Sequence, residues 1–153
     1  MKKNFLPIAI DIADSKILVV GGGQSALKKI KILQRFDARI DVLAPEFIPE
    51  IHRLNVTRIQ KTFEKSDLSG YLMLYSCTDN KAFDRQITEY GRESGVLINV
   101  HDTPELCQFV SPAIYRDGNI SVAVSSNAED VHEAIRIRNL IQNYLENLKS
   151  TSI

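Results

Sequence analysis

The chain has 153 residues, 44% of them hydrophobic, and its 19 basic residues balance 19 acidic ones. This length suits one domain with a short appendage, and a net charge of zero gives no general attraction to nucleic acid or to an anionic membrane. We find no signal peptide and no hydrophobic run of membrane length, and the two cysteines, Cys77 and Cys107, form no CxxC pair. The sequence therefore predicts a cytoplasmic protein without a zinc knuckle, a disulfide framework, a nucleic-acid partner or a membrane anchor.

The chain begins with a short segment of alternating polarity, which a buried strand and a helix follow. Residues 6–12 alternate in polarity, and we interpret them as an edge strand or as a segment laid over a sheet. Residues 16–20 form a β-branched apolar run, typical of a strand buried on both faces. Three glycines follow, and apolar side chains then recur at helical spacing through residues 26–36. The order is therefore strand, glycine turn and helix.

The glycine turn matches a nucleotide-binding fingerprint. Gly21-x-Gly23-x-x-Ala26 has the dinucleotide pattern in its alanine-ended form. Gly21 suits the tight turn, Gly23 lets the backbone approach a diphosphate, and Ala26 allows the helix to pack closely on the strand. We expect the diphosphate on the amide groups of the helix N-terminus, where the helix dipole also favours an anion. The predicted cofactor-binding residues are Gly21, Gly22, Gly23, Gln24 and Ser25.

The second strand indicates which nucleotide is bound. Residues 39–44 have the pattern of this strand, and the acidic residue that holds the ribose hydroxyls is expected near its end. Glu46 has that position, whereas Asp41 comes too early. No arginine follows closely enough to hold a 2′-phosphate, so NAD is favoured over NADP. This adds Ala44, Pro45 and Glu46 to the predicted cofactor-binding residues.

The middle of the chain continues to alternate between strands and helices, with a short helix at 47–54, strands at 56–63, 71–77 and 96–100, and a helix at 81–93 closed by Gly95. Thr78 and Asp79 follow a buried strand, so we place them beside the cofactor crevice. The alternative is that one of them caps the next helix, and both roles can coexist. The pattern predicts an α/β fold with a Rossmann-like, doubly wound parallel sheet.

The last part of the chain predicts a small extension. Residues 109–114 and 120–124 are strand-like around a short turn, which joins antiparallel neighbours. Residues 126–129 have capping-box spacing before a long helix. That helix has an apolar stripe, which packs on a partner subunit or on its own sheet. The stripe consists of Ala134, Ile137, Ile141, Leu145 and Leu148.

One carboxylate stands out as a candidate catalytic group. Asp102 follows the strand at 96–100, which we expect to be central, and it would lie where a nicotinamide projects and could accept a proton during oxidation. From spacing alone, capping of a short helix by Asp102 or Thr103 is favoured over this role. His52, His101 and His132 lie in separate elements, so no metal site is predicted.

An ordered set of residues resembles a known family. The set runs through Leu6-Pro7-Ile8-Ala9-Ile10-Asp11, Val19 to Gly23, the Lys28-Lys29 pair, Ala44-Pro45-Glu46, Thr78-Asp79, Ile98 to Asp102, Pro104 to Cys107, Phe109, Pro112-Ala113-Ile114 and Val124-Ser125-Ser126. This order is similar to the precorrin-2 dehydrogenase family, the amino-terminal module of siroheme synthases. The match covers nearly everything from residue 6 to about residue 138.

The resemblance implies NAD-dependent oxidation of the tetrapyrrole precorrin-2 to sirohydrochlorin, a step in siroheme formation. It implies catalysis by Asp102 rather than a capping role. It also implies substrate binding by Ser125, Ser126 and Asn127, and an intertwined homodimer. We accordingly expect an NAD-binding domain at 1–112 and a dimerisation and substrate-side extension at 113–153, shorter than in longer family members.

The chain departs from the family pattern after Ser126. Two glycines and a Ser-Pro step are usual there, but this chain has Asn127-Ala128 and Asp130-Val131. The lost backbone freedom and the added negative charge of Asp130 predict either weaker binding of the expected substrate, a polycarboxylate, or an altered pocket. Two alternative functions remain. The resemblance also allows a dehydrogenase that inserts ferrous iron into sirohydrochlorin, and the altered segment suggests a non-catalytic NAD-sensing module.

Overall fold

The computed structural model describes residues 3–151 of the chain. The chain divides into two compact units. The first, which we call the sheet unit, comprises residues 9–109. The second, the hairpin–helix unit, comprises the described parts of residues 1–8 and 110–153.

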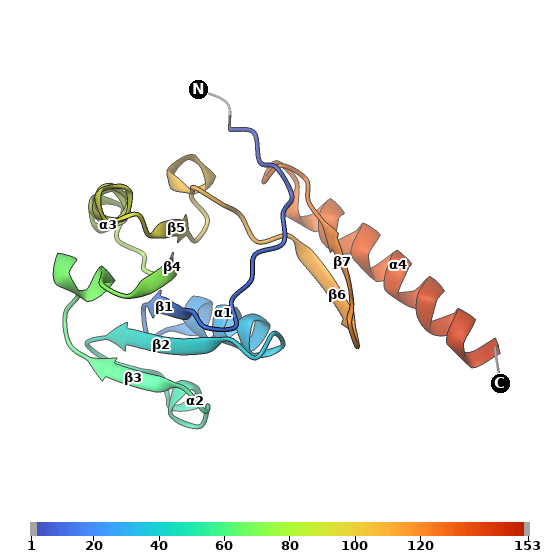
Figure 1. Cartoon of the computed structure of the whole chain (residues 1–153), viewed down its shortest axis with the longest axis horizontal. Helices are drawn as coiled ribbons and strands as arrows, with labels where there is room; N and C mark the ends of the chain where they lie inside the picture. The colour runs from blue at the N-terminus through green and yellow to red at the C-terminus, as the bar shows by residue number, and fades with distance from the viewer. Residues whose placement is uncertain (1–2, 152–153) are drawn as a thin grey trace. The chain divides into compact units, whose positions relative to one another are not determined.

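The sheet unit contains five parallel strands in the order β3-β2-β1-β4-β5 (Figure 1). From β1 the chain proceeds outward through β2 to β3, then crosses back to β4 on the other side of β1 and continues to β5. The strand order therefore reverses between β1 and β4, which is the switch point of a doubly wound sheet. The predicted fold class is confirmed. The strands are β1 (Lys16–Val20), β2 (Arg39–Ala44), β3 (Thr57–Gln60), β4 (Tyr71–Ser76) and β5 (Leu97–Val100).

Helices cover the sheet because successive side chains of each strand point to opposite faces. Met73 and Tyr75 of β4 belong to the core cluster that the buried face of α1 completes, whereas Ser76 contacts Asp84 of α3. Full burial of an aliphatic side chain such as those on α1 contributes about 1.5–3 kcal/mol to folding. The helical segments of this unit are α1 (Gln24–Gln34), α2 (Pro49–His52), α3 (Lys81–Ser94), and the 3-10 turns η1 (Lys65–Leu68) and η2 (Pro104–Leu106).

The ends of α3 test two sequence predictions. Gly95 closes the helix with a left-handed φ of 70°, as predicted. The N-terminal cap is Asn80, whose Oδ1 accepts hydrogen bonds from the backbone N–H groups of Ala82 and Phe83, each 3.1 Å long. The prediction that Thr78 or Asp79 is the cap is therefore wrong. The helix begins at Lys81, as predicted, and the residue immediately before it, Asn80, supplies the side chain that reaches both amides.

The hairpin–helix unit consists of an antiparallel pair, β6 (Ala113–Asp117) and β7 (Ile120–Val124), and the helix α4 (Val131–Thr151). The helix packs on its own hairpin. Arg138 Nη1 donates a 3.0 Å hydrogen bond to the carbonyl oxygen of Ile114, Lys149 pairs with Asp117, and Ala134 is buried. Several large apolar side chains of α4 are exposed, among them Ile135, Leu140, Tyr144 and Leu148.

Two segments of this part of the fold differ from prediction. Residues 6–12 form no strand, so the edge-strand alternative is wrong and the alternative of a covering segment stays a prediction, and β6 begins at Ala113 rather than at 109. Helix α4 begins after Asp130, whose Oδ1 accepts a 2.8 Å hydrogen bond from the backbone N–H of Glu133. Ser126 caps no helix, because its hydroxyl oxygen accepts from the backbone N–H of Asp130 instead. The extra carboxylate of Asp130 thus has a structural role as the cap.

Asn127 and Ala128 lie in the turn before this cap with φ angles of 57° and 62°. Both angles fall in the left-handed region, which asparagine tolerates but which costs alanine about 1–2 kcal/mol and glycine nothing comparable. These two positions therefore have the backbone conformation that favours glycine, although asparagine and alanine occupy them.

Ala128→Gly should stabilise the protein. Relief of the left-handed strain outweighs the greater entropy of glycine in the unfolded chain, giving a net gain of about 0.5–1 kcal/mol. Thermal melting checks the effect. The matched control is Ala82→Gly in the exposed first turn of α3, which should destabilise by up to about 1 kcal/mol. Equal shifts in both variants would contradict the assignment of strain to Ala128.

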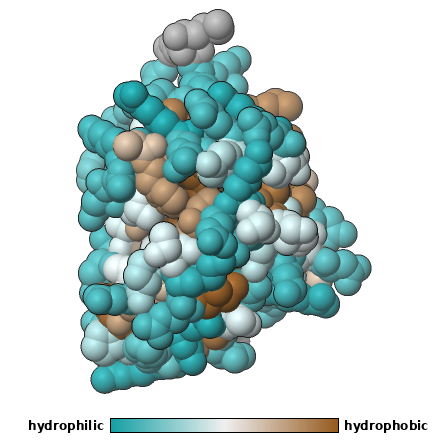
Figure 2. Space-filling view, turned by 90° about the vertical axis from the view of Figure 1, so that its left-hand side faces the viewer, coloured by the Kyte–Doolittle hydropathy of each residue, from teal (hydrophilic) through white to brown (hydrophobic). Residues whose placement is uncertain are grey.

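No helix among residues 3–151 is both long and apolar enough to cross a membrane. On the face shown in Figure 2, hydrophilic side chains predominate and hydrophobic atoms form smaller patches between them. This distribution agrees with the balanced charge of the sequence.

Candidate functional site

Three loops meet at the carboxyl edge of the sheet, and backbone hydrogen bonds join them. The N–H of Gly21 donates to the carbonyl of Leu43 at the end of β2, over 2.9 Å. The N–H of Cys77 donates to the carbonyl of Val20, over 2.8 Å, from the end of β4. Since β1 and β4 flank the switch point, the glycine turn lies where nucleotides bind in open parallel sheets.

The three glycines of this turn have different surroundings. Gly21 has a φ of 126°, and a Cβ built there would lie 2.4 Å from the backbone oxygen of Cys77. A Cβ on Gly22 would lie 1.8 Å from the backbone oxygen of Glu46. A Cβ on Gly23 would meet no atom within 4 Å. Close approach of neighbouring loops therefore requires glycine at the first two positions, whereas Gly23 faces open space.

That open space lies at the N-terminus of α1. Gly23 is the N-cap residue, no side chain caps the helix, and its first turn contains no acidic residue. The amide groups of Gln24 and Ser25 are in this first turn, so they are available to an anion that the helix dipole attracts. The residues present thus fit the diphosphate of a dinucleotide.

The predicted ribose-binding residues lie at the end of β2, at the same carboxyl edge of the sheet. Ala44 is buried, and its Cβ lies 3.1 Å from the position of a Cβ on Gly22. Pro45 and Glu46 are exposed, and the N–H of Ile48 donates to the carbonyl of Gly22 over 2.9 Å. The backbone of Glu46 consequently lies beside the glycine turn, and its role toward a ribose stays a prediction.

Asp102 lies at the carboxyl end of β5. This strand is at the edge of the sheet, so the prediction that Asp102 follows a central strand is wrong. The side chain of Asp102 is 87% exposed, and its Oδ2 lies 3.3 Å from His101 Nε2. Its backbone has a left-handed φ of 54°, a conformation that clusters at functional sites.

The capping interpretation of this segment is also wrong. Thr103 is the residue before η2, and its side chain makes no capping hydrogen bond. Its hydroxyl instead donates to the carbonyl of His101, over 3.3 Å. The carboxylate of Asp102 is therefore not committed to the backbone of η2 and is open to solvent.

Sequence reasoning missed a cluster in which Lys29, itself half-buried, lies near the buried side chains of Tyr75, Cys77 and Cys107. Lys29 Nζ lies 4.5 Å from the centre of the Tyr75 ring, close enough for a cation–π interaction. Burial lowers the pKa of Lys29, and the nearby thiols of Cys77 and Cys107 oppose this shift. The signal was present in the spacing, because Lys29 comes three residues after Ala26 and four before Leu33, which places it beside the buried side of α1.

The two thiols should be inert in the folded protein. Both are buried, and burial raises the pKa of Cys77 from 9.0 to about 11. At about pH 8 the native protein should therefore react with a thiol reagent roughly a hundredfold more slowly than the unfolded chain. Because the folded pKa is raised, this group contributes stability below pH 9 that is lost as the pH rises toward 11. Rapid labelling of either cysteine in native buffer would contradict this prediction.

The predicted substrate-binding residues lie in the hairpin–helix unit, whereas Asp102 and the glycine turn lie in the sheet unit. Ser125 is exposed, and the hydroxyl of Ser126 accepts from Asp130. The Asn127 amide is engaged at both ends: its Oδ1 accepts from the N–H of Phe5, and its Nδ2 donates to the carbonyl of Lys3, over 2.7 and 3.0 Å.

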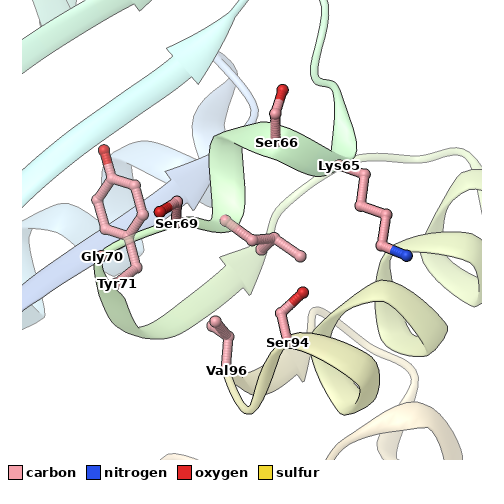
Figure 3. Close-up of a pocket in the computed structure, with 8 residues that line it drawn as sticks. Lys65, Ser66, Ser69, Gly70, Tyr71, Ser94 and Val96 are labelled. Carbon is pink, nitrogen blue, oxygen red and sulfur yellow. The ribbon is translucent and has the colours of Figure 1, made fainter.

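A cavity of about 530 Å³ lies at the opposite, amino edge of the sheet, where β4 begins. Figure 3 shows Tyr71 and Lys65 on opposite sides of it. The Tyr71 hydroxyl donates a 2.7 Å hydrogen bond to Asp41. Burial, followed by this bond, raises the pKa of Tyr71. The cavity is separate from the predicted cofactor site. Among the described residues, no group of three or more His, Cys, Asp or Glu side chains could hold a metal ion.

A parallel sheet with a glycine turn and an uncapped helix at its switch point defines a dinucleotide-binding protein of the Rossmann type. The chain belongs to the NAD(P)-binding family, whose family model matches residues 8–113.

Known proteins and structures of similar sequence or fold extend this comparison. "Siroheme synthase" of Thioalkalivibrio sulfidiphilus (strain HL-EbGR7) is 31% identical over 146 residues, which are 93% of this chain and 30% of that protein. "Siroheme synthase" of Ruthia magnifica subsp. Calyptogena magnifica is 34% identical over 127 residues, 80% of this chain and 27% of that protein. A solved structure titled "SirC, precorrin-2 dehydrogenase" shares the fold, with a TM-score of 0.74, 22% identity, and coverage of 92% of this chain and 71% of that one. The chain thus spans less than a third of the length of these siroheme synthases.

Proposed function

We propose that this protein is an NAD-dependent precorrin-2 dehydrogenase that oxidises precorrin-2 to sirohydrochlorin in siroheme formation. The observation that carries the proposal is the glycine turn, in which Gly23 opens onto an uncapped helix N-terminus at the switch point. The names of the similar proteins support the choice of substrate. NAD rather than NADP is proposed because Glu46 follows β2 and would repel a 2′-phosphate.

Different residues would bind the cofactor and accept the proton during oxidation. The amide groups of Gln24 and Ser25 would hold the diphosphate, and Glu46 would accept hydrogen bonds from the ribose hydroxyls. Bound NAD supplies a hydride acceptor. Removal of a hydride must be accompanied by loss of a proton, and Asp102 would accept that proton, since its carboxylate is exposed and caps no helix.

The test is an assay of the purified full chain with precorrin-2 and NAD under anaerobic conditions. NADH and sirohydrochlorin should form in equal amounts, and NADP should support a much lower rate. A chain that binds NAD but produces neither product would reject the dehydrogenase.

One observation favours the non-catalytic NAD-sensing alternative. The amide of Asn127, which was predicted to bind substrate, is held by the backbone of Lys3 and Phe5. A sensing module would show an NAD-dependent rise in melting temperature without NADH formation from precorrin-2. NADH formation would exclude this alternative.

We also propose that the chain forms a homodimer in the cytoplasm, with residues 1–112 as the NAD-binding domain and residues 113–153 as the dimerisation and substrate-side extension. A two-stranded hairpin with one helix is a marginal structure alone, and α4 leaves Leu140 and Tyr144 55% and 65% exposed. Leu140→Asp should convert the dimer to a monomer in light scattering, whereas Asn143→Asp on the same helix should not. A wild-type chain that is monomeric at micromolar concentration would contradict the dimer.

A further inference from the structure

The loop between β4 and α3 is anchored by a carboxylate that the mechanism above does not use. Asp84, in the first turn of α3, is only 2% exposed. Its Oδ1 accepts two hydrogen bonds, from the hydroxyl of Ser76 over 2.6 Å and from the hydroxyl of Thr78 over 3.2 Å. Charged side chains are rarely buried to this extent unless they are hydrogen-bonded, and here two hydroxyl groups at the end of β4 donate to Oδ1.

This arrangement determines whether the Thr78 hydroxyl can donate or accept a further hydrogen bond. A threonine hydroxyl has one hydrogen and two lone pairs. Its hydrogen is committed to Asp84, so toward any other group Thr78 can act only as an acceptor. Thr78 is half-buried and follows β4 at the carboxyl edge, whereas Ser76 is fully buried. Of the two residues whose hydroxyls donate to Asp84, only Thr78 is partly exposed, and it is therefore the one that a bound nucleotide could contact.

We propose that Asp84 is a positioning residue for the nucleotide: it holds the Thr78 hydroxyl as a hydrogen-bond acceptor for an O–H or N–H group of NAD. This inference rests on the proposed function, because it requires NAD in the crevice. Asp84 itself does not touch the nucleotide, and it acts through Thr78.

The experiment measures NAD affinity of the full-length chain by calorimetry. Asp84→Ala releases the Thr78 hydroxyl and should weaken NAD binding about tenfold, the size of one hydrogen bond to a well-placed acceptor. Asp84→Asn retains the acceptor oxygen and should bind within about twofold of wild type. In the precorrin-2 assay, Asp84→Ala should raise KM for NAD and leave kcat nearly unchanged.

Two further variants separate positioning from general stability. Thr78→Val removes the hydroxyl but keeps the shape, and it should also weaken NAD binding about tenfold. Because both residues act on one contact, the double variant should be no weaker than either single variant. Ser76→Ala removes the other bond to Asp84, so it should lower the melting temperature yet leave NAD affinity within about twofold of wild type.

The outcomes distinguish this inference from the function on which it rests. A wild-type chain that binds no NAD overturns the proposed function and this inference with it. A wild-type chain that binds NAD, with Asp84→Ala at wild-type affinity, overturns only the role of Asp84. Additive losses of about a hundredfold in the double variant overturn it as well. If Asp84→Ala fails to fold, Thr78→Val compared with Ser76→Ala decides: equal affinities overturn the proposal, and a loss confined to Thr78→Val supports it.

Discussion

Replacing Asp102 by alanine should lower kcat for precorrin-2 oxidation by a factor of about 10²–10⁴, the usual contribution of a positioned base. NAD affinity should stay within about twofold of wild type. Asp102 follows β5, which is two strands away from β1 and the glycine turn, so the loss falls on the proton transfer and not on cofactor binding. Stopped-flow measurement of NADH formation and calorimetry with NAD check the two expectations separately.

The backbone of Asp102 requires a second variant, because its φ of 54° disfavours alanine. Asparagine tolerates this conformation and has the same shape as aspartate, but it cannot accept the proton. Asp102→Asn should therefore be as slow as Asp102→Ala while melting like wild type. Glu105→Gln, which changes an exposed carboxylate three residues further along, should keep full activity. If Asp102→Asn keeps the wild-type kcat, Asp102 has no part in the proton transfer.

The sequence predicted the parts of the fold that depend on local pattern. The strand at 16–20, the glycine turn and the amphipathic helix are each specified by neighbouring residues, and β1 and α1 lie where these patterns place them. The same holds for Gly95, since only glycine readily adopts the left-handed conformation that ends α3. Strong periodicity and special backbone angles leave few alternatives.

The remaining differences arise from contacts between distant segments. That β5 lies at the sheet edge depends on strand order, which no local window contains. The need for glycine at Gly22 comes from the backbone oxygen of Glu46, 24 residues away. The cap of α3 was misplaced for a different reason. Thr78, Asp79 and Asn80 all have side chains that can cap a helix, so composition cannot decide which of them is the cap.

The candidate site shows the same difference between features that local sequence predicts and features that depend on contacts between distant segments. Spacing predicted the glycine turn and proposed an acidic residue after β2, but it did not predict the contact of Lys29 with Tyr75 or the two hydroxyls that converge on Asp84. A lysine on a helix is usually solvated, so its place on the buried face of α1 was overlooked. The hydrogen bonds to Asp84 become visible only when β4 and α3 are packed together.

Replacing Gly23 by aspartate should abolish NAD binding without unfolding the protein. The new carboxylate would stand at the helix N-terminus in place of the diphosphate and repel it, which we expect to weaken binding at least about a hundredfold. The fold should tolerate the change, because no atom lies within 4 Å of the added Cβ and the φ of Gly23 is −100°. Calorimetry with NAD and thermal melting without it provide the two readouts.

Neighbouring substitutions separate the binding effect from the packing effect. Gly23→Ala adds only a methyl group beside the diphosphate and should weaken NAD binding less than Gly23→Asp, with an unchanged melting temperature. In Gly22→Ala the methyl carbon would lie 1.8 Å from the backbone oxygen of Glu46. A contact this short forces the two loops apart, at a cost of about 3 kcal/mol, so Gly22→Ala should melt well below wild type even without NAD. Wild-type NAD affinity in Gly23→Asp would show that the diphosphate does not lie on the N-terminus of α1.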